Sequence, residues 1–156
     1  MHQLLKKNLD LDQLNTLAND IAAISNSGDL LLLNGELGAG KTSFSRFFIN
    51  SIYEKNSLKK PEIIRSPSFP ILITYEIKNF EIFHYDFYRL NNEKDLKELN
   101  IFENLEKNIT IIEWPAVILK YYKNINYFFL NFKIINSRKR ELEIFHTKKT
   151  KFKNVF

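Results

Sequence analysis

The residues best suited to chemistry stand together in residues 35–42, which read GELGAGKT. This segment satisfies the phosphate-loop pattern G-x-x-x-x-G-K-[ST] at every fixed position. Such a loop curls successive backbone N–H groups around a phosphate, which needs backbone conformations that few residues other than glycine adopt. Three of the chain's 4 glycines lie in this segment. The phosphates of a nucleotide are therefore expected to contact Gly35, Glu36, Leu37, Gly38, Ala39, Gly40, Lys41 and Thr42, and Ser43 directly after them.

Lys41 and Thr42 end this segment and carry its cationic and metal-binding groups. We expect the Lys41 ammonium between the β- and γ-phosphates, where it offsets the charge that repels an attacking nucleophile. We expect the Thr42 hydroxyl to bind Mg²⁺, which prefers oxygen ligands in near-octahedral geometry and usually keeps several waters. A carboxylate near Thr42 should therefore complete the metal site, either directly or through water.

Two carboxylates that end apolar runs are candidates for this position. Glu113 follows the run ITII, as an acidic residue at the carboxyl end of a buried strand would, and ligands of such sheets bind at that end. Asp86 stands in the run HYDFYRL. Our preferred assignment gives Glu113 the metal, through water, and gives Asp86 the attacking water or an outer contact to the metal. The alternative is that one of the two only caps a strand end.

Other residues near these acids have both a functional and a structural interpretation. His84 is either a catalytic base or a packed or hydrogen-bonded strand residue, and the second interpretation is favoured. Arg89 is expected to pair with Asp86 or with a phosphate. Trp114 is the chain's 1 tryptophan and belongs either to the core or, because it follows a candidate metal ligand, beside the nucleotide. Residues 66–69, SPSF, form either a switch that senses the γ-phosphate or an ordinary proline turn.

The elements around the phosphate loop occur in the order that such a site requires. Residues 29–34 are a short apolar run bounded by Gly28, which is typical of a buried strand. After the loop, Phe44, Phe48 and Ile52 recur with a spacing near that of a helix, and this helix should end near Glu54. The positive end of the helix dipole would then face the phosphates.

The remaining pattern predicts an α/β fold, a single P-loop NTPase-type domain whose central mixed β-sheet is flanked by helices. The sheet should be parallel near the phosphate loop and antiparallel in its hairpins. The expected elements are an edge strand at 3–6, a helix capped by Asp10 or Asp12 and running to about 25, a hairpin at 71–76 and 80–87, a short helix at 93–99, a strand at 108–113, and strands at 125–135 and 141–146. We assign residues 1–147 to the domain and 148–156 to a basic C-terminal tail.

Composition limits the possible classes of protein. A chain of 156 residues with 44% hydrophobic residues suits one domain with one core. The chain has no cysteine, which excludes a disulfide framework and a cysteine metal site. The net charge of +5 could favour an anionic partner such as nucleic acid, but no dense block of basic residues interleaves with an exposed aromatic pattern, so a solvated surface is favoured. The first residues are too short and charged for a secretory signal and no run is long enough to span a membrane, so we expect a cytoplasmic protein.

The motifs together resemble one family, the TsaE ATPases of bacterial tRNA threonylcarbamoyladenosine biosynthesis. The matching segments are residues 35–46, residues 66–69, residues 84–90 and residues 112–115 (IEWP). The resemblance implies a small α/β ATPase that binds ATP and Mg²⁺. It also implies that the chain binds the catalytic threonylcarbamoyl transferase subunit and its dimerising partner subunit, with tRNA contacted indirectly or weakly.

The resemblance further implies where some residues act. It makes Thr42 and Glu113 magnesium-associated and places Leu11 and Asp12 close to the nucleotide base. The family's switch usually reads Ser-Pro-Thr, whereas this chain keeps the hydroxyl but loses a methyl at Ser68. A glycine is common where Asn100 stands, which predicts an altered turn there. Residues beyond about 120 carry no signature of the family.

Two other functions stay open on the sequence. A small-molecule P-loop kinase would need an acceptor pocket and usually an arginine-rich lid, and no arginine cluster follows Glu113. A non-enzymatic binding module would use ATP only to order residues 66–69. The sequence therefore favours the ATPase and leaves the small kinase and the binding module as alternatives.

Overall fold

The computed structural model describes residues 1–103 and 105–147. Its centre is a seven-stranded sheet in the order β1-β7-β6-β2-β5-β4-β3. The predicted basic tail at 148–156 lies outside the described residues. The strands are β1 His2–Leu9, β2 Leu30–Asn34, β3 Leu72–Glu76, β4 Glu81–Asp86, β5 Ile109–Glu113, β6 Phe128–Ile134 and β7 Arg140–His146.

The sheet is parallel in the middle and antiparallel toward both edges. Strand β2 pairs in parallel with β5 and β6, and β5 pairs in parallel with β4. Strands β1, β7 and β6 form antiparallel pairs at one side, and β3 and β4 form another at the other side. This arrangement confirms the predicted α/β fold with a mixed sheet.

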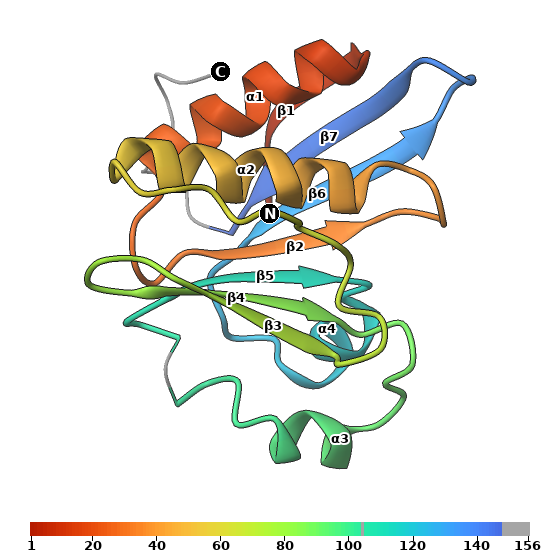
Figure 1. Ribbon diagram of the computed structural model, residues 1–156. Coiled ribbons are helices and arrows are strands. Elements are labelled where there is room, and N and C mark those ends of the chain that lie inside the picture. The colour runs from red at the N-terminus through yellow and green to blue at the C-terminus, as the bar shows by residue number, and fades with distance from the viewer. Residues whose placement is uncertain (104, 148–156) are drawn as a thin grey trace.

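Helices cover both faces of the sheet (Figure 1). Helices α1 (Leu11–Ile24) and α2 (Lys41–Lys55) lie on one face, and α3 (Glu93–Glu98) and α4 (Ala116–Tyr121) lie on the other. Strand β2 is therefore covered on both faces, and its four leucines are buried. Burial on both faces explains why this strand is continuously apolar in sequence rather than alternating.

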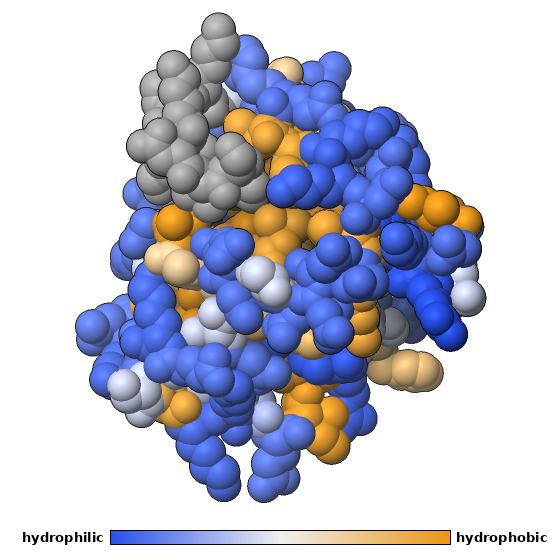
Figure 2. Space-filling view, turned by 90° about the horizontal axis from the view of Figure 1, so that it is seen from above, coloured by the Kyte–Doolittle hydropathy of each residue, from blue (hydrophilic) through white to orange (hydrophobic). Residues whose placement is uncertain are grey.

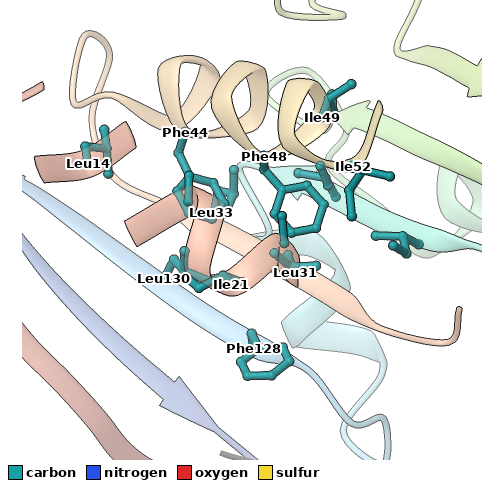
Figure 3. Packing of buried hydrophobic residues seen from close by; sticks show 14 of the residues in the cluster. Leu14, Ile21, Leu31, Leu33, Phe44, Phe48, Ile49, Ile52, Phe128 and Leu130 are labelled. Atoms are coloured by element: carbon teal, nitrogen blue, oxygen red, sulfur yellow. The ribbon is translucent and has the colours of Figure 1, made fainter. Parts of the chain in front are cut away.

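The core between the sheet and helices α1 and α2 contains buried residues of both helices, including the apolar face predicted for α2. Figure 3 shows Phe44, Phe48 and Ile52 of α2 directed toward Leu31 and Leu33 of β2. Each of these five side chains is at most 1% exposed. Burial of a phenylalanine or leucine side chain stabilises the fold by about 1.5–3 kcal/mol, so this layer holds the phosphate-loop helix on the sheet.

The start of α1 is fixed by a reciprocal cap. The Asp10 carboxylate accepts a hydrogen bond from the Gln13 backbone N–H at 2.9 Å, and the Gln13 side chain accepts one from the Asp10 N–H at 3.0 Å. Of the two predicted caps, Asp10 is therefore the one used, and Asp12 lies in the first turn. Asp12 is left exposed at the beginning of the helix.

Two expectations about the elements were wrong in detail. The edge strand expected at residues 3–6 runs over all of β1, because its backbone pairs with β7 along most of its length. Helix α4 was not among the expected elements.

Among the described residues, no helix is long and apolar enough to be a candidate membrane span. Figure 2 views the molecule from the side of α1 and α2, where hydrophilic residues cover most of the surface and hydrophobic residues show in patches between them. This view agrees with two helices whose apolar faces are turned toward the sheet.

Candidate nucleotide-binding site

The phosphate-loop segment joins the carboxyl end of β2 to the amino end of α2, as the sequence predicts. Gly40 precedes α2 in the left-handed region with φ 109°, which a side chain adopts only with strain. A Cβ added to Gly35 would lie 2.6 Å from the Phe132 carbonyl oxygen of β6. The loop therefore needs glycine at Gly35 to pass close to the neighbouring strand.

Lys41 lies at the first position of α2, 4% exposed, with its ammonium turned back into the loop. Its Nζ donates hydrogen bonds to the carbonyl oxygens of Gly35 at 2.7 Å and Glu36 at 2.9 Å. Burial lowers the pKa of Lys41 below that of a free lysine, and three nearby carboxylates oppose part of this shift. A cation held in this way presents its charge inside the loop.

The two candidate acids lie side by side. Asp86 ends β4 and Glu113 ends β5, and the parallel pairing of these strands makes the two residues direct partners in register. Asp86 is 5% exposed and Glu113 is 2% exposed. The carboxyl ends of parallel strands meet at the same edge of a sheet, so both carboxylates face the phosphate loop.

Glu113 receives hydrogen bonds from both the helix and the sheet. Its Oε2 accepts from the Thr42 hydroxyl at 3.1 Å. Its Oε1 lies 2.9 Å from Nε2 of His84 and accepts from the Ser45 hydroxyl at 3.5 Å. These contacts fix the carboxylate beside the Thr42 side chain that the sequence assigns to magnesium.

His84 is fully buried on β4. It is a hydrogen-bonded strand residue, which was the favoured one of its two interpretations. His84 stands two residues before Asp86 on β4, so both side chains lie on the same face of the sheet. The sequence signal that could have found its contact with Glu113 is this spacing of two residues, combined with the register of β4 and β5.

Asp86 is bound by the predicted switch segment, residues 66–69. The hydroxyl groups of Ser66 and Ser68 each donate to Oδ2 of Asp86 at 2.8 Å. The backbone N–H of Tyr88 donates to Oδ1 at 2.9 Å. The segment therefore contacts the site through the hydroxyl that Ser68 retains.

Arg89 contacts the backbone of this segment. Its Nη2 donates to the Phe69 carbonyl oxygen at 3.0 Å and to the Ser68 carbonyl oxygen. The expected pairing with Asp86 is not found among the described residues, because the guanidinium binds these two carbonyl oxygens and lies over the Phe69 ring. Arg89 thus supports the segment that binds Asp86.

Trp114 lies beside the phosphate loop rather than in the core. The Lys41 Nζ is 3.8 Å from the centre of its ring, and the Tyr88 ring is 4.9 Å away, centre to centre. Trp114 has a φ of 60°, which is uncommon for a residue other than glycine. This backbone turn at the end of β5 brings the ring next to the cation.

Two cavities flank the phosphate loop. One, of about 500 Å³, is lined by loop residues 37–43, by two residues of the segment 66–69, and by residues at or just after the ends of β4 and β5, namely Ser66, Ser68, Asp86, Tyr88, Glu113 and Trp114. The other, of about 450 Å³, lies between the start of α1 and the turn between β6 and β7, and Leu11 and Asp12 line it. Gly38, Gly40 and Ser43 line both cavities, so the loop separates them.

The donor set suits magnesium and a triphosphate. No group of three or more His, Asp or Glu side chains placed to hold a metal ion occurs in the described part of the chain. Magnesium commonly takes one or two carboxylates together with substrate phosphates and waters, and Thr42 and Glu113 supply oxygen atoms of this kind. The positive φ angles of Gly35, Gly38 and Gly40 turn the loop in the manner of a phosphate cradle.

Residue 100 is a departure from the family pattern that the structure explains. Asn100 follows α3 with a φ of 48°, the left-handed conformation that glycine adopts most easily and asparagine tolerates best among other residues. The chain therefore keeps the turn that a glycine would make.

The chain is similar to proteins of one family. The family model described as "Threonylcarbamoyl adenosine biosynthesis protein TsaE" matches residues 9–143. A relative from Rickettsia typhi, called tRNA threonylcarbamoyladenosine biosynthesis protein TsaE, is 40% identical over 112 residues, which are 72% of this chain and 74% of the relative. A Bacillus subtilis protein of the same name is 30% identical over 119 residues, 76% of this chain and 70% of the relative.

Other matches agree with this result. A TsaE from Rickettsia felis is 42% identical over 102 residues, 65% of this chain and 57% of the relative, so the match spans little more than half of that protein. The crystal structure of YdiB from Bacillus subtilis superposes with a TM-score of 0.69 over 95% of this chain and 89% of that chain, at 22% identity, and so shares the fold. Because the family model covers most of the chain, from the cap of the first helix to the last strand, the chain belongs to the TsaE family, whose members are named for threonylcarbamoyladenosine biosynthesis.

Proposed function

We propose that the chain binds ATP with Mg²⁺ and hydrolyses it, and that this hydrolysis serves the threonylcarbamoyladenosine modification of tRNA. The observation that carries the proposal is the pairing of Asp86 and Glu113 in register, facing the phosphate-loop residues Lys41 and Thr42. A triphosphate on the loop would meet a cation, a metal-binding hydroxyl and two buried carboxylates at one end. These are the groups that phosphoryl transfer to water requires.

Each residue has a role in this proposal. Lys41 would bind the β- and γ-phosphates, and Thr42 and Glu113 would hold the metal, Glu113 through water. Bound magnesium neutralises charge on the phosphates. Asp86 orients the attacking water, and residues 66–69 contact the γ-phosphate through the Ser68 hydroxyl. Lys41, Asp86 and Glu113 are the catalytic residues in this assignment.

The nucleotide occupies both sides of the loop in the proposal. The backbone of Gly35 to Gly40 and the Ser43 side chain cradle the phosphates, and the Trp114 ring lies against the same end of the site. Leu11 and Asp12 contact the nucleoside on the other side of the loop. Support comes from the two cavities, which share Gly38, Gly40 and Ser43 in their lining.

The partners in the proposal are the catalytic threonylcarbamoyl transferase subunit and its dimerising partner subunit, in the cytoplasm. Support comes from the names of the relatives, which connect them with this pathway. The cavity beside Trp114 is open to solvent at Leu37 and Tyr88, which are 86% and 67% exposed. We therefore expect slow hydrolysis by the isolated chain and faster hydrolysis with the partners, which would exclude water and complete the site.

The direct test is ATP hydrolysis by the parent chain and by Lys41→Ala, with and without the two transferase subunits. The parent should be slow alone and accelerated by the subunits, and the variant should lose ATP affinity by roughly 100-fold, because a charged hydrogen-bond donor to phosphate is removed. Turnover by the variant equal to that of the parent would refute the proposed mechanism. Fast hydrolysis that the subunits leave unchanged would refute the dependence on partners.

A second measurement tests the biological role. Threonylcarbamoyladenosine formation on tRNA is followed over many turnovers with and without this chain, and with the chain carrying Glu113→Gln. The parent should sustain repeated rounds and the variant should not. If the variant supports modification as well as the parent does, the chain acts as a nucleotide-gated binding module and not as an ATPase.

A further inference from the structure

The hairpin of β6 and β7 carries no recognisable motif, yet it contacts the phosphate loop at three points. The Phe132 carbonyl oxygen lies 2.6 Å from the position that a Cβ of Gly35 would take, and the Phe132 ring lies 3.9 Å from the Cβ position of Gly40. Arg140 donates a hydrogen bond from Nη2 to the Gly38 carbonyl oxygen at 3.2 Å. The loop therefore rests on this hairpin along its length.

The guanidinium of Arg140 joins two segments that are far apart in sequence. Its Nη1 donates to the carbonyl oxygens of Asn136 at 2.6 Å and Lys139 at 3.0 Å, which close the turn of the hairpin. Its Nη2 reaches the tip of the phosphate loop. Because the planar guanidinium fixes the relative directions of its donors, it fixes the turn relative to Gly38.

Gly38 has little else to hold it. A Cβ built at this position meets no atom of the described residues within 4 Å, so its side of the loop tip gains nothing from packing. Gly38 has a φ of 76°, and a glycine can adopt many other backbone conformations close to this one at little cost. The Arg140 hydrogen bond therefore adds a restraint at the loop tip to those that Lys41 and the loop backbone already supply at Gly35 and Glu36.

The same arginine lines the cavity on the nucleoside side of the loop. This cavity has a volume of about 450 Å³, within the usual range for a small-molecule site, and the turn contributes Ser137, Arg138 and Arg140 to its wall. Asp10 and Asp12 line the opposite side. A ligand whose phosphates lie on the loop would extend between an acidic wall and a basic one.

We propose that Arg140 is a positioning residue of the nucleotide site. It holds the phosphate loop in its binding conformation through the Gly38 carbonyl and holds the turn at 135–139 as a wall of the nucleoside cavity. This inference rests on the proposed binding of a nucleotide at the loop. Arg140 lies on the opposite side of the loop from Asp86 and Glu113, so it affects nucleotide affinity and leaves the chemical step at saturating ATP unchanged.

The test measures binding of two probes, ADP and inorganic tripolyphosphate, each with Mg²⁺, by calorimetry. Arg140→Gln removes the fixed set of donors and should weaken both probes roughly tenfold, because it acts through the loop. Arg140→Lys retains the charge but has fewer hydrogen-bond donors, so its affinity for each probe should lie between those of the parent and of Arg140→Gln. Arg138→Gln should weaken ADP and leave tripolyphosphate unchanged, because the latter has no nucleoside.

Lys139→Gln is the matched control, since it also removes one positive charge from this hairpin, whereas Lys139 does not line the cavity. Equal weakening by Lys139→Gln and Arg140→Gln would mean a general charge effect and would overturn the inference. Parent-like affinity of Arg140→Gln for both probes would overturn it too. Thermal unfolding without ligand checks the fold, and Arg140→Lys decides the question if Arg140→Gln does not fold.

Steady-state ATP hydrolysis provides a second readout. Arg140→Lys should raise KM while kcat stays within about twofold of the parent, as expected for a lost interaction present equally in ground and transition states. A loss of kcat without a change in KM would overturn the positioning role. If the parent binds neither ADP nor tripolyphosphate, the proposed function fails as well, which is distinct from failure of the Arg140 inference alone.

Discussion

At the scale of single residues, the Glu113 carboxylate contacts both the phosphate-loop helix and the neighbouring strand of the sheet. One oxygen accepts from Thr42 on the phosphate-loop helix, and the other lies against His84 on β4. Such contacts pre-set the orientation of a carboxylate before any ligand binds, which lowers the cost of arranging it during a reaction. Asp86 is held in a similar way by two serines.

Glu113→Gln and Asp86→Asn keep the shape of each side chain and remove its charge. We expect each to lower the rate of ATP hydrolysis by roughly 100-fold or more, since each removes a carboxylate placed for the chemical step. Nucleotide affinity, measured by calorimetry with ADP, should change much less, because Lys41 and the loop backbone remain. A variant that hydrolyses ATP at the parent rate would exclude that carboxylate from catalysis.

His84→Leu removes the partner of a carboxylate that is 2% exposed. The loss of a hydrogen bond to a buried carboxylate destabilises the folded state by about 1–3 kcal/mol, so the free energy of unfolding should fall by that amount. Urea denaturation followed by circular dichroism measures it. His84→Gln, which keeps a donor on a side chain of similar length, is the control and should recover part of the loss.

At the scale of elements, strand pairing determines which residues meet. The parallel register of β4 with β5 sets Asp86 opposite Glu113, and a slip of one residue would send one of them to the other face of the sheet. Strand β6 lies on the other side of β2 and passes directly under the phosphate loop. The loop is therefore positioned by three neighbouring strands and by α2.

Two glycines of the loop give a matched pair of substitutions. Gly35→Ala would place its Cβ 2.6 Å from the Phe132 carbonyl oxygen, whereas the Cβ of Gly38→Ala would point into open space. We expect Gly35→Ala to lower the free energy of unfolding by about 2–4 kcal/mol, because backbone must move, and Gly38→Ala by about 1 kcal/mol from its positive φ alone. Equal losses in urea denaturation would contradict the close contact between loop and strand.

At the scale of the whole molecule, the two faces of the sheet are covered differently. One buried cluster joins the sheet to α1 and α2, and a second joins it to α3 and α4. On strands β1, β7 and β6, charged residues form a cross-strand network in which Lys6 and Lys133 both bind Glu143, at 2.9 and 3.0 Å. This network connects the edge strand to the part of the sheet that carries the phosphate loop.

These contacts lower the pKa of Glu143 to about 2, chiefly through its hydrogen bonds from Lys6 and Lys133. A carboxylate with a lowered pKa in the folded state contributes stability above the pKa of the unfolded chain, and this contribution is lost as pH falls through the folded value. Glu143→Gln should therefore lower Tm at pH 6 by roughly 1–3 °C, as for a partly exposed ion pair. The difference from the parent should disappear as the pH approaches 2.

Thermal unfolding of the parent and the variant between pH 6 and pH 2 measures this effect. Added salt should reduce the difference at pH 6, because exposed charges are screened. A difference that stays constant down to pH 2 would show that the variant acts through packing and not through the ionised carboxylate.

The sequence alone determined the phosphate loop, the strand before it and the helix after it, because these features are local and have strict requirements at each position. Glycines at fixed spacing and a continuous apolar run can be identified without knowledge of any partner. The acidic ends of two strands were also visible in this way, as were the two serines of residues 66–69.

Only the tertiary structure decided how these pieces meet. The contact of His84 with Glu113 and the binding of two serines to Asp86 depend on strand register and chain packing, which no local pattern encodes. The place of Arg140 against Gly38 joins residues 102 positions apart, and no sequence motif marks it. Local geometry therefore selects the loop from the sequence, whereas the pairing of distant strands arranges the chemistry around it.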